Sequence, residues 1–171
     1  MTGVQTCALP IFESLDIHSK EYRDKNEETL SAFLTMIGTK DFSHKDGSLY
    51  DHLMRTYYIL QVFFDNPTLS LIGGLHSVYG TTIYKKTCLP KESNLVKDVF
   101  GAEVDRLVRI FGTMDRRLLE NPDQSLSEND FTILRLVEVA NLYDQGPLVN
   151  RPNLIKFAKD VQEKLKTSGQ I

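Results

Sequence analysis

Apolar residues recur at spacings of three and four along most of the chain, which is the period of an amphipathic α-helix. The pattern predicts six or seven helices, over residues 16–37, 48–65, 69–79, 93–100, 102–119, 127–143 and 152–166. Strand-like alternation competes with this pattern over no more than about four residues at a time. The sequence therefore predicts an all-α fold, a single-domain helical bundle over residues 12–166 with a frayed tail at 167–171.

Several residues predict where these helices begin, end and touch. Gly38 suits a helix C-terminus, because glycine adopts a positive φ without strain. Ser127, followed three residues later by Asp130, approximates an N-terminal capping box. Gly73-Gly74 lacks the pattern of a phosphate-binding loop and predicts close packing of two helices instead.

Composition limits the class of protein. The 171 residues are 41% hydrophobic and 25% charged, which suffices for one domain with a real core. A formal net charge of −3 argues against a broad nucleic-acid-binding surface, and no apolar run approaches the ~20 residues that span a bilayer. Two cysteines, Cys7 and Cys88, are too few for a disulfide framework or a cysteine zinc site. We expect a cytoplasmic protein that binds neither nucleic acid nor membrane, and a homodimer stays open.

The first residues stand apart from the helical pattern. Residues 2–11, Thr-Gly-Val-Gln-Thr-Cys-Ala-Leu-Pro-Ile, resemble the in-frame translation of a short-read sequencing adapter. The segment lacks the basic region and the continuous apolar stretch of a signal peptide. We therefore predict that residues 1–11 are not native and that the gene comes from metagenomic data.

Three polar side chains fall on apolar helix faces. His52 aligns with Ile59, His76 with Ile72, and Asn141 aligns with apolar neighbours four and seven residues earlier. A buried polar group without a partner costs a few kcal/mol, so these side chains need each other, water, a metal or a ligand. The coincidence on three helices favours a shared site over three separate core residues.

The order of these residues resembles that of the HD superfamily of metal-dependent phosphohydrolases. In that superfamily a histidine, a His-Asp pair and a late aspartate on successive helices bind divalent cations. His52 would be the first ligand, His76-Ser77 the doublet and Asn141 the late residue. The string from Gly73 to Thr81, with His-Ser-Val-Tyr-Gly-Thr in place of His-Asp, looks more like a small uncharacterised HD-like family. The resemblance covers about residues 28–146 and implies an HD-like bundle and hydrolysis.

The departures from that pattern leave two chemical alternatives. Ser77 and Asn141 are neutral where the superfamily has carboxylates, so divalent-cation binding should be weaker. His52 and His76 could hold a single Zn, Fe or Mn ion, with His44 as a third nitrogen. Without a metal, His52 and His76 would act as general acid and base.

Further residues are candidates for the lining of the same pocket, although each also has a structural interpretation. Arg116, for example, could bind an anionic group of a substrate, but a solvated charged face at the helix end is the favoured interpretation. The candidate catalytic residues are His52, His76 and Asn141, and the candidate pocket residues are Ser77, Tyr79, Thr81, Arg55, Asp115, Glu138 and His44. The predicted function is a hydrolase of a small polar or phosphorylated metabolite, and the alternative is a non-catalytic domain that binds a metabolite in the same cavity.

Overall fold

The computed structural model describes residues 25–120 and 125–168, and this part of the chain is helical. Seven α-helices are found there: α1 Lys25–Met36, α2 Leu49–Phe64, α3 Pro67–Leu75, α4 Leu95–Phe100, α5 Ala102–Thr113, α6 Glu128–Gln145 and α7 Pro152–Thr167. Three short 3-10 helices join them: η1 Thr39–Asp41, η2 Arg116–Leu119 and η3 Pro147–Asn150. The prediction of an all-α, single-domain fold is confirmed.

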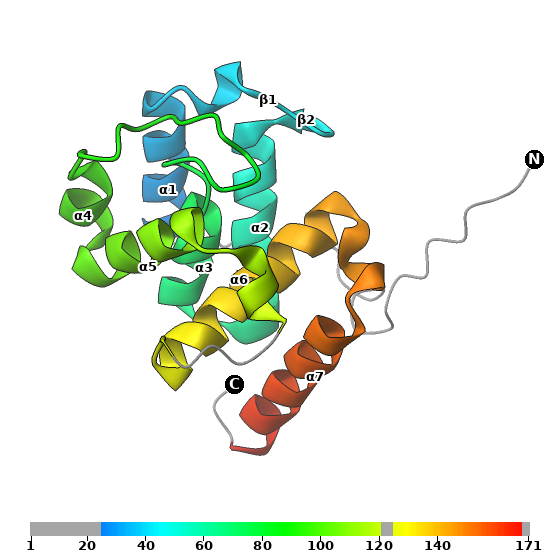
Figure 1. Cartoon of the computed structure of the whole chain (residues 1–171). Helices are drawn as coiled ribbons and strands as arrows, with labels where there is room; N and C mark the ends of the chain where they lie inside the picture. Colours follow the sequence, from blue (N-terminus) through cyan, green and yellow to red (C-terminus); the bar gives the residue numbers. More distant parts are fainter. Residues whose placement is uncertain (1–24, 121–124, 169–171) are drawn as a thin grey trace, which may run out of the picture.

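A small hairpin is the exception to the helical pattern. Strands β1 (Ser43–His44) and β2 (Gly47–Ser48) pair antiparallel, with Ser43 opposite Ser48. Each strand is only two residues long, which is too short for a sequence period to reveal. The hairpin leads directly into α2 (Figure 1).

Helices α2 and α3 form the centre of the bundle, and α6 packs against both (Figure 1). A Cβ added at Gly73 would lie 2.3 Å from Cδ1 of Leu60, and one at Gly74 would lie 2.5 Å from Cδ2 of Leu30. The predicted close packing at the two glycines is therefore confirmed. Helix α7 covers the outer side of α2 and α6 (Figure 1).

The helix starts follow local hydrogen bonding. Ser48 and Asp51 form a complete capping box at the start of α2. At α6 the Ser127 hydroxyl accepts from the Asp130 N–H at 3.1 Å, but the Asp130 carboxylate binds Arg106 instead of closing the box. The capping box predicted there is thus half formed.

The third predicted helix ends at Leu75, four residues earlier than expected. The ring of His76 donates from Nδ1 to the Gly73 carbonyl, at 2.6 Å. That carbonyl is the one that the Ser77 N–H would use if the helix continued. His76 therefore lies at the end of α3 rather than within it, and the chain turns at Gly80, whose φ is +74°.

The fifth predicted helix also ends early. Helix α5 stops at Thr113, Met114 is extended, and Asp115 accepts from the Arg117 N–H at the start of η2. After this change of direction Leu118 is 43% exposed and Leu119 is buried.

The predictions for residues 1–11, 16–24 and 121–122 lie outside the described residues. Within the described ranges, none of the helices combines the length and the apolar character that crossing a membrane requires.

Candidate functional site

Two histidines from different elements meet in the middle of the bundle. His52, one turn into α2, faces His76 at the end of α3, and their Nε2 atoms are 3.3 Å apart. The two rings stand nearly perpendicular, with an interplanar angle of 83°. Both side chains are buried, with 0% of His52 and 2% of His76 exposed. The structure thus brings together the two histidines that the sequence singled out.

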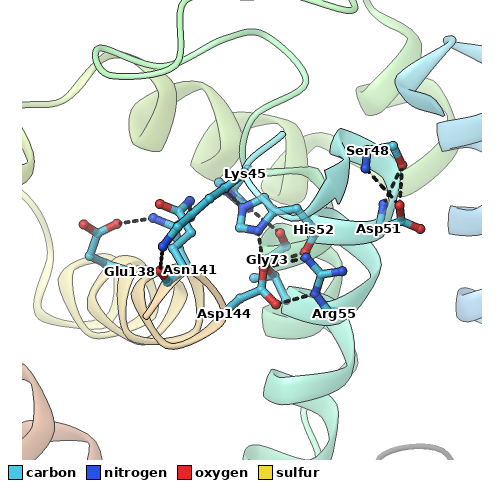
Figure 2. Close-up of polar contacts among 12 residues, drawn as sticks. Lys45, Ser48, Asp51, His52, Arg55, Gly73, Glu138, Asn141 and Asp144 are labelled. Atoms are coloured by element: carbon cyan, nitrogen blue, oxygen red, sulfur yellow. Dashed lines mark hydrogen bonds and ion pairs between the residues drawn. The ribbon is translucent and has the colours of Figure 1, made fainter. Parts of the chain in front are cut away.

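The outer nitrogen of each ring has an acceptor. His52 Nδ1 lies 2.6 Å from Oδ2 of Asp144 on α6, and His76 Nδ1 lies 2.6 Å from the Gly73 carbonyl (Figure 2). Since carboxylates and carbonyls only accept, both Nδ1 atoms carry a proton. In neutral rings both Nε2 atoms are therefore unprotonated, and two lone pairs face each other across 3.3 Å.

Two facing lone pairs repel unless something cationic lies between them. A proton shared between the rings would do so, which makes one of the histidines an imidazolium beside the Asp144 carboxylate. A metal cation bound by both nitrogens would do so as well, and with bonds of about 2.0–2.1 Å it would lie to one side of the line between them. A positive charge at this point would therefore remove the repulsion.

Asp144 fixes the His52 ring and pairs with a cation of its own. Arg55, one turn after His52 on α2, donates from Nε to Oδ1 of Asp144 at 2.5 Å and from Nη2 to Oδ2 at 3.2 Å. Burial alone would raise the pKa of Asp144, but the hydrogen bonds from His52 and Arg55 outweigh it and hold that pKa below its ordinary value. The carboxylate is therefore ionised at neutral pH.

His76 is held neutral by its surroundings. Burial disfavours the charged ring and lowers the pKa of His76 well below its ordinary value, and the positive charge available to His52 and Arg116 adds to this effect. His76 Nε2 is therefore an acceptor for a proton or a ligand for a cation.

The β1–β2 hairpin closes the site on one side. The His44 ring stacks on the His52 ring, with centroids 4.2 Å apart and an angle of 8°, and tilts against Tyr84 at 5.5 Å. Lys45, at the hairpin turn, donates to the Gln145 carbonyl at 2.6 Å, which fastens the turn to the end of α6 (Figure 2). Burial lowers the pKa of His44 as well. The predicted third histidine is thus beside the pair, as a stacked ring.

A second set of charged side chains lies beyond His76. Arg116 donates from Nη1 to Oε2 of Glu138 at 2.5 Å, and the guanidinium lies 3.5 Å from the centre of the Phe111 ring. The edge of Phe111 in turn meets His76, with ring centres 5.3 Å apart. Burial raises the pKa of Glu138, against the pull of Arg116 and Asn141. The ion pair is buried, with side-chain exposures of 9% and 5%.

Asn141 is buried as predicted, but its amide is used within α6. It donates to Glu138 at 3.1 Å, and its carbonyl accepts from Gln145 at 2.9 Å (Figure 2). The amide thus links the Arg116–Glu138 pair to the end of α6. Both of these bonds are to its own helix, whereas the residue of α6 that binds His52 is Asp144.

Some predicted pocket residues serve other contacts. Tyr79 binds Asp105 on α5, Thr81 caps the backbone of Tyr84, and Asp115 binds Arg117 with a side chain that is 43% exposed. These three bonds hold the loop after α3 and the start of η2 rather than the histidine pair. Ser77 is buried next to His76, and its carbonyl accepts from Gly80.

Sequence reasoning missed Asp144 as the partner of His52. The signal was present, because Asp144 follows Asn141 by three residues and therefore lies near it on the same helix face. The apolar pattern drew attention to Asn141, whose neighbours at four and seven residues are buried. Asp144 lies close to the end of α6, where the apolar pattern becomes weak, so that pattern does not indicate the carboxylate.

The donor set fits one cation in part. Two Zn–N bonds of about 2.0–2.1 Å at a tetrahedral angle place their nitrogens about 3.3–3.4 Å apart, which matches the observed 3.3 Å. Ligating histidines usually give their other N–H to a carboxylate or a carbonyl, as both rings do. Within residues 25–120 and 125–168, no group of three or more His, Cys, Asp or Glu side chains is arranged to hold a metal ion. The protein would thus supply two ligands, with the remaining positions left to water or substrate.

Comparisons with known proteins add a family match. Residues 33–116 match the model of a family described as Domain of unknown function (DUF6817). The match includes His44, His52 and His76 and ends at Arg116, before α6. No curated protein and no solved structure matches the chain. The HD superfamily is not among these findings, so the likeness to it stays a resemblance in the order of a few residues. Residues 33–116, just under half of the chain, are therefore similar to this family.

Proposed function

We propose that the protein is a small hydrolase in which His52 and His76 hold one divalent cation, Zn²⁺ or Fe²⁺ before Mn²⁺. The observation that supports this most is the pair of Nε2 lone pairs facing each other at 3.3 Å, each with its Nδ1 proton already donated. Nitrogen ligands favour Zn²⁺ and Fe²⁺, whereas Mn²⁺ prefers oxygen. In hydrolases such a cation supplies Lewis-acid polarisation of the substrate and activation of water.

The remaining residues of the cluster orient the two rings. Asp144 binds His52 Nδ1 and increases the basicity of the ring, and Arg55 holds the carboxylate in place. The Gly73 carbonyl does the same for His76. Each ligand therefore keeps its orientation before the cation binds, which reduces the entropy lost on binding.

Substrate access requires movement of the hairpin. His44 covers His52, and the rings of His52 and His76 are both buried. The His44 stack and the bond from Lys45 to α6 hold the tip of the hairpin over the pair, so the tip could move away while the bundle stays intact. We propose that the hairpin moves as the substrate enters.

The same atoms favour a second function if the rings share a proton. His52 would then donate from Nε2 to His76 while Asp144 balances its charge, and the cluster would be an acid–base pair or a polar core. The complete burial of both rings agrees with a non-catalytic domain, and a small metabolite would reach the cluster only after the hairpin moves. Metal content separates this function from the first.

The first test measures metal content after incubation with Zn²⁺, Fe²⁺ or Mn²⁺. We expect about one ion per wild-type chain and a melting temperature that falls on chelation. His52→Asn and His76→Gln should lose the ion. Thr56→Val is the matched control, because Thr56 is buried one turn after His52 and offers no ring nitrogen. A wild-type chain that holds no ion and ignores the chelator would contradict the proposal.

The second test measures hydrolysis of 4-nitrophenyl phosphate by the metal-loaded protein. We expect turnover in wild-type protein and in Thr56→Val, and none in His76→Gln. His44→Ala should keep its metal and change the rate, since His44 covers the site by stacking on His52. Metal binding without turnover of this or any other ester would favour the binding domain instead.

A further inference from the structure

A row of stacked and edge-on rings runs through the site, and a polar atom without a partner lies at each end. The row consists of Tyr84, His44, His52, His76, Phe111 and the guanidinium of Arg116. Among the described residues, neither the Tyr84 hydroxyl nor the Arg116 Nε has a hydrogen-bond partner, although both atoms are buried. Such atoms are rare in native proteins because each one costs free energy.

Arg116 is the more informative of the two. Its side chain is 9% exposed, and its Nη1 donates to Glu138. Guanidinium groups carry five donors and stay charged at every relevant pH, and here the buried Nε–H is left unused among the described residues. A buried, charged group of this kind suits an anionic ligand.

A structural role alone explains Arg116 less well. Arg135 on α6 also has a buried Nε without a partner among the described residues, but its guanidinium packs against Phe157 at 4.0 Å, away from the histidines. Arg116 packs on the ring that touches His76, and its charge contributes to the lowered pKa of His76. The Phe111 ring therefore connects Arg116 to the histidine pair.

We propose that Arg116 binds an oxyanion through its Nε–H. The inference goes beyond the proposed function, because it assigns a binding residue outside the histidine pair. Glu138 holds the guanidinium in place and also competes with the anion for it. Because Nε is buried, binding follows a local opening and is slower than a diffusional encounter.

The test titrates metal-free protein with inorganic phosphate and with acetate, by calorimetry and by phosphorus NMR. We expect phosphate to bind wild-type protein and the double variant Arg116→Gln/Glu138→Gln to bind at least tenfold more weakly. The double variant removes both charges together, which avoids a buried carboxylate without a partner. Arg117→Gln is the control, because Arg117 is the next arginine, is 88% exposed, and should not affect binding.

Glu138→Gln alone sharpens the test. It keeps the shape of the side chain and removes the competing charge, so phosphate should bind more tightly than to wild-type protein. Acetate binding with the same dependence on Arg116 would support the oxyanion and indicate a carboxylate substrate. Binding of neither ion, or equal binding to the double variant, would overturn the inference.

These outcomes are independent of the metal proposal. Phosphate binding is measured without metal, and metal content depends on His52 and His76 rather than on Arg116. A chain that binds metal but no anion loses the further inference alone. A chain that binds the anion but no metal loses the proposed function and keeps Arg116 as an anion-binding residue.

Discussion

Two buried polar networks in the bundle differ in how completely they are satisfied. In the first, Tyr79 donates to Asp105 at 2.7 Å and accepts from Arg109 at 3.0 Å, while Arg109 also binds Asp105 and the Ser93 carbonyl. In the second, His52 and His76 face each other with their lone pairs, and Arg116 keeps an unpartnered Nε among the described residues.

The comparison separates a structural network from a candidate binding site. The Tyr79 network joins the loop after α3 to α5, and its three side chains, Tyr79, Asp105 and Arg109, bond to one another, so a ligand would gain little there. The histidine network leaves two groups without a matching partner among the described residues: the facing Nε2 lone pairs and the Arg116 Nε–H. Buried groups in that condition are retained where something binds.

The largest expected effect lies in the satisfied network. Asp105→Ala removes a buried carboxylate and leaves Tyr79 and Arg109 without it, so the free energy of unfolding should fall by about 2–3 kcal/mol. Denaturant unfolding measures the loss, and metal content should not change. Glu103→Ala on the same helix is the control, because Glu103 is 56% exposed. An equal loss of unfolding free energy in both variants would contradict a special role for the buried carboxylate.

In the histidine network we expect a loss of metal affinity rather than a large loss of stability. Asp144→Asn keeps the size of the side chain but removes the charge that orients His52, so metal affinity should fall by about 10–100-fold. Competition with a fluorescent chelator measures it. Asp98→Asn, on the exposed side of α4, should leave the affinity unchanged. Unchanged metal affinity in Asp144→Asn would mean that Asp144 does not support a ligand.

The two networks should also differ in their response to pH. The pKa of His76 is lowered in the folded state, so between about 6.5 and that lower value the unfolded chain binds a proton that the folded chain does not. Stability is therefore full above about pH 6.5 and falls with decreasing pH, by up to about 1.4 kcal/mol per unit. The charged or titratable groups that act on His76 are His52, Arg116 and His44.

Unfolding of chelator-treated protein between pH 7.5 and 5.5, a range of about two units, measures this slope. His76→Gln should flatten it. Tyr79→Phe should not, because burial and Asp105 raise the pKa of Tyr79 far above this range. The same slope in His76→Gln and wild-type protein would contradict the assignment of a buried neutral ring.

The smallest effect is the loss of one hydroxyl. Tyr79→Phe removes the bond to Asp105 but leaves Arg109 paired with that carboxylate, so the free energy of unfolding should fall by about 1 kcal/mol. The ring still packs against the Arg109 guanidinium, at 4.2 Å. A loss as large as that in Asp105→Ala would show that the hydroxyl, and not the ion pair, holds the network together.

The sequence predicted the helices and the inward position of both histidines, because helical periodicity places a side chain on a face without knowledge of its neighbours. It could not predict where α3 ends, since that depends on a bond between the His76 ring and a carbonyl. It also missed the stacking of His44, because a hairpin of two-residue strands has no periodicity. Asp144 and the role of Arg116 depend on which helices become neighbours, and spacing along one helix does not contain that information.

Gly73 links the apolar core to the chemistry of the site. It lacks the methyl group that would collide with Leu60, and its carbonyl fixes the proton on His76. The distance between the two imidazoles is therefore governed by how closely two helix backbones approach. A change in packing at Leu60 should therefore alter which cation the proposed site prefers, since ions of different radius require different separations between their donor atoms.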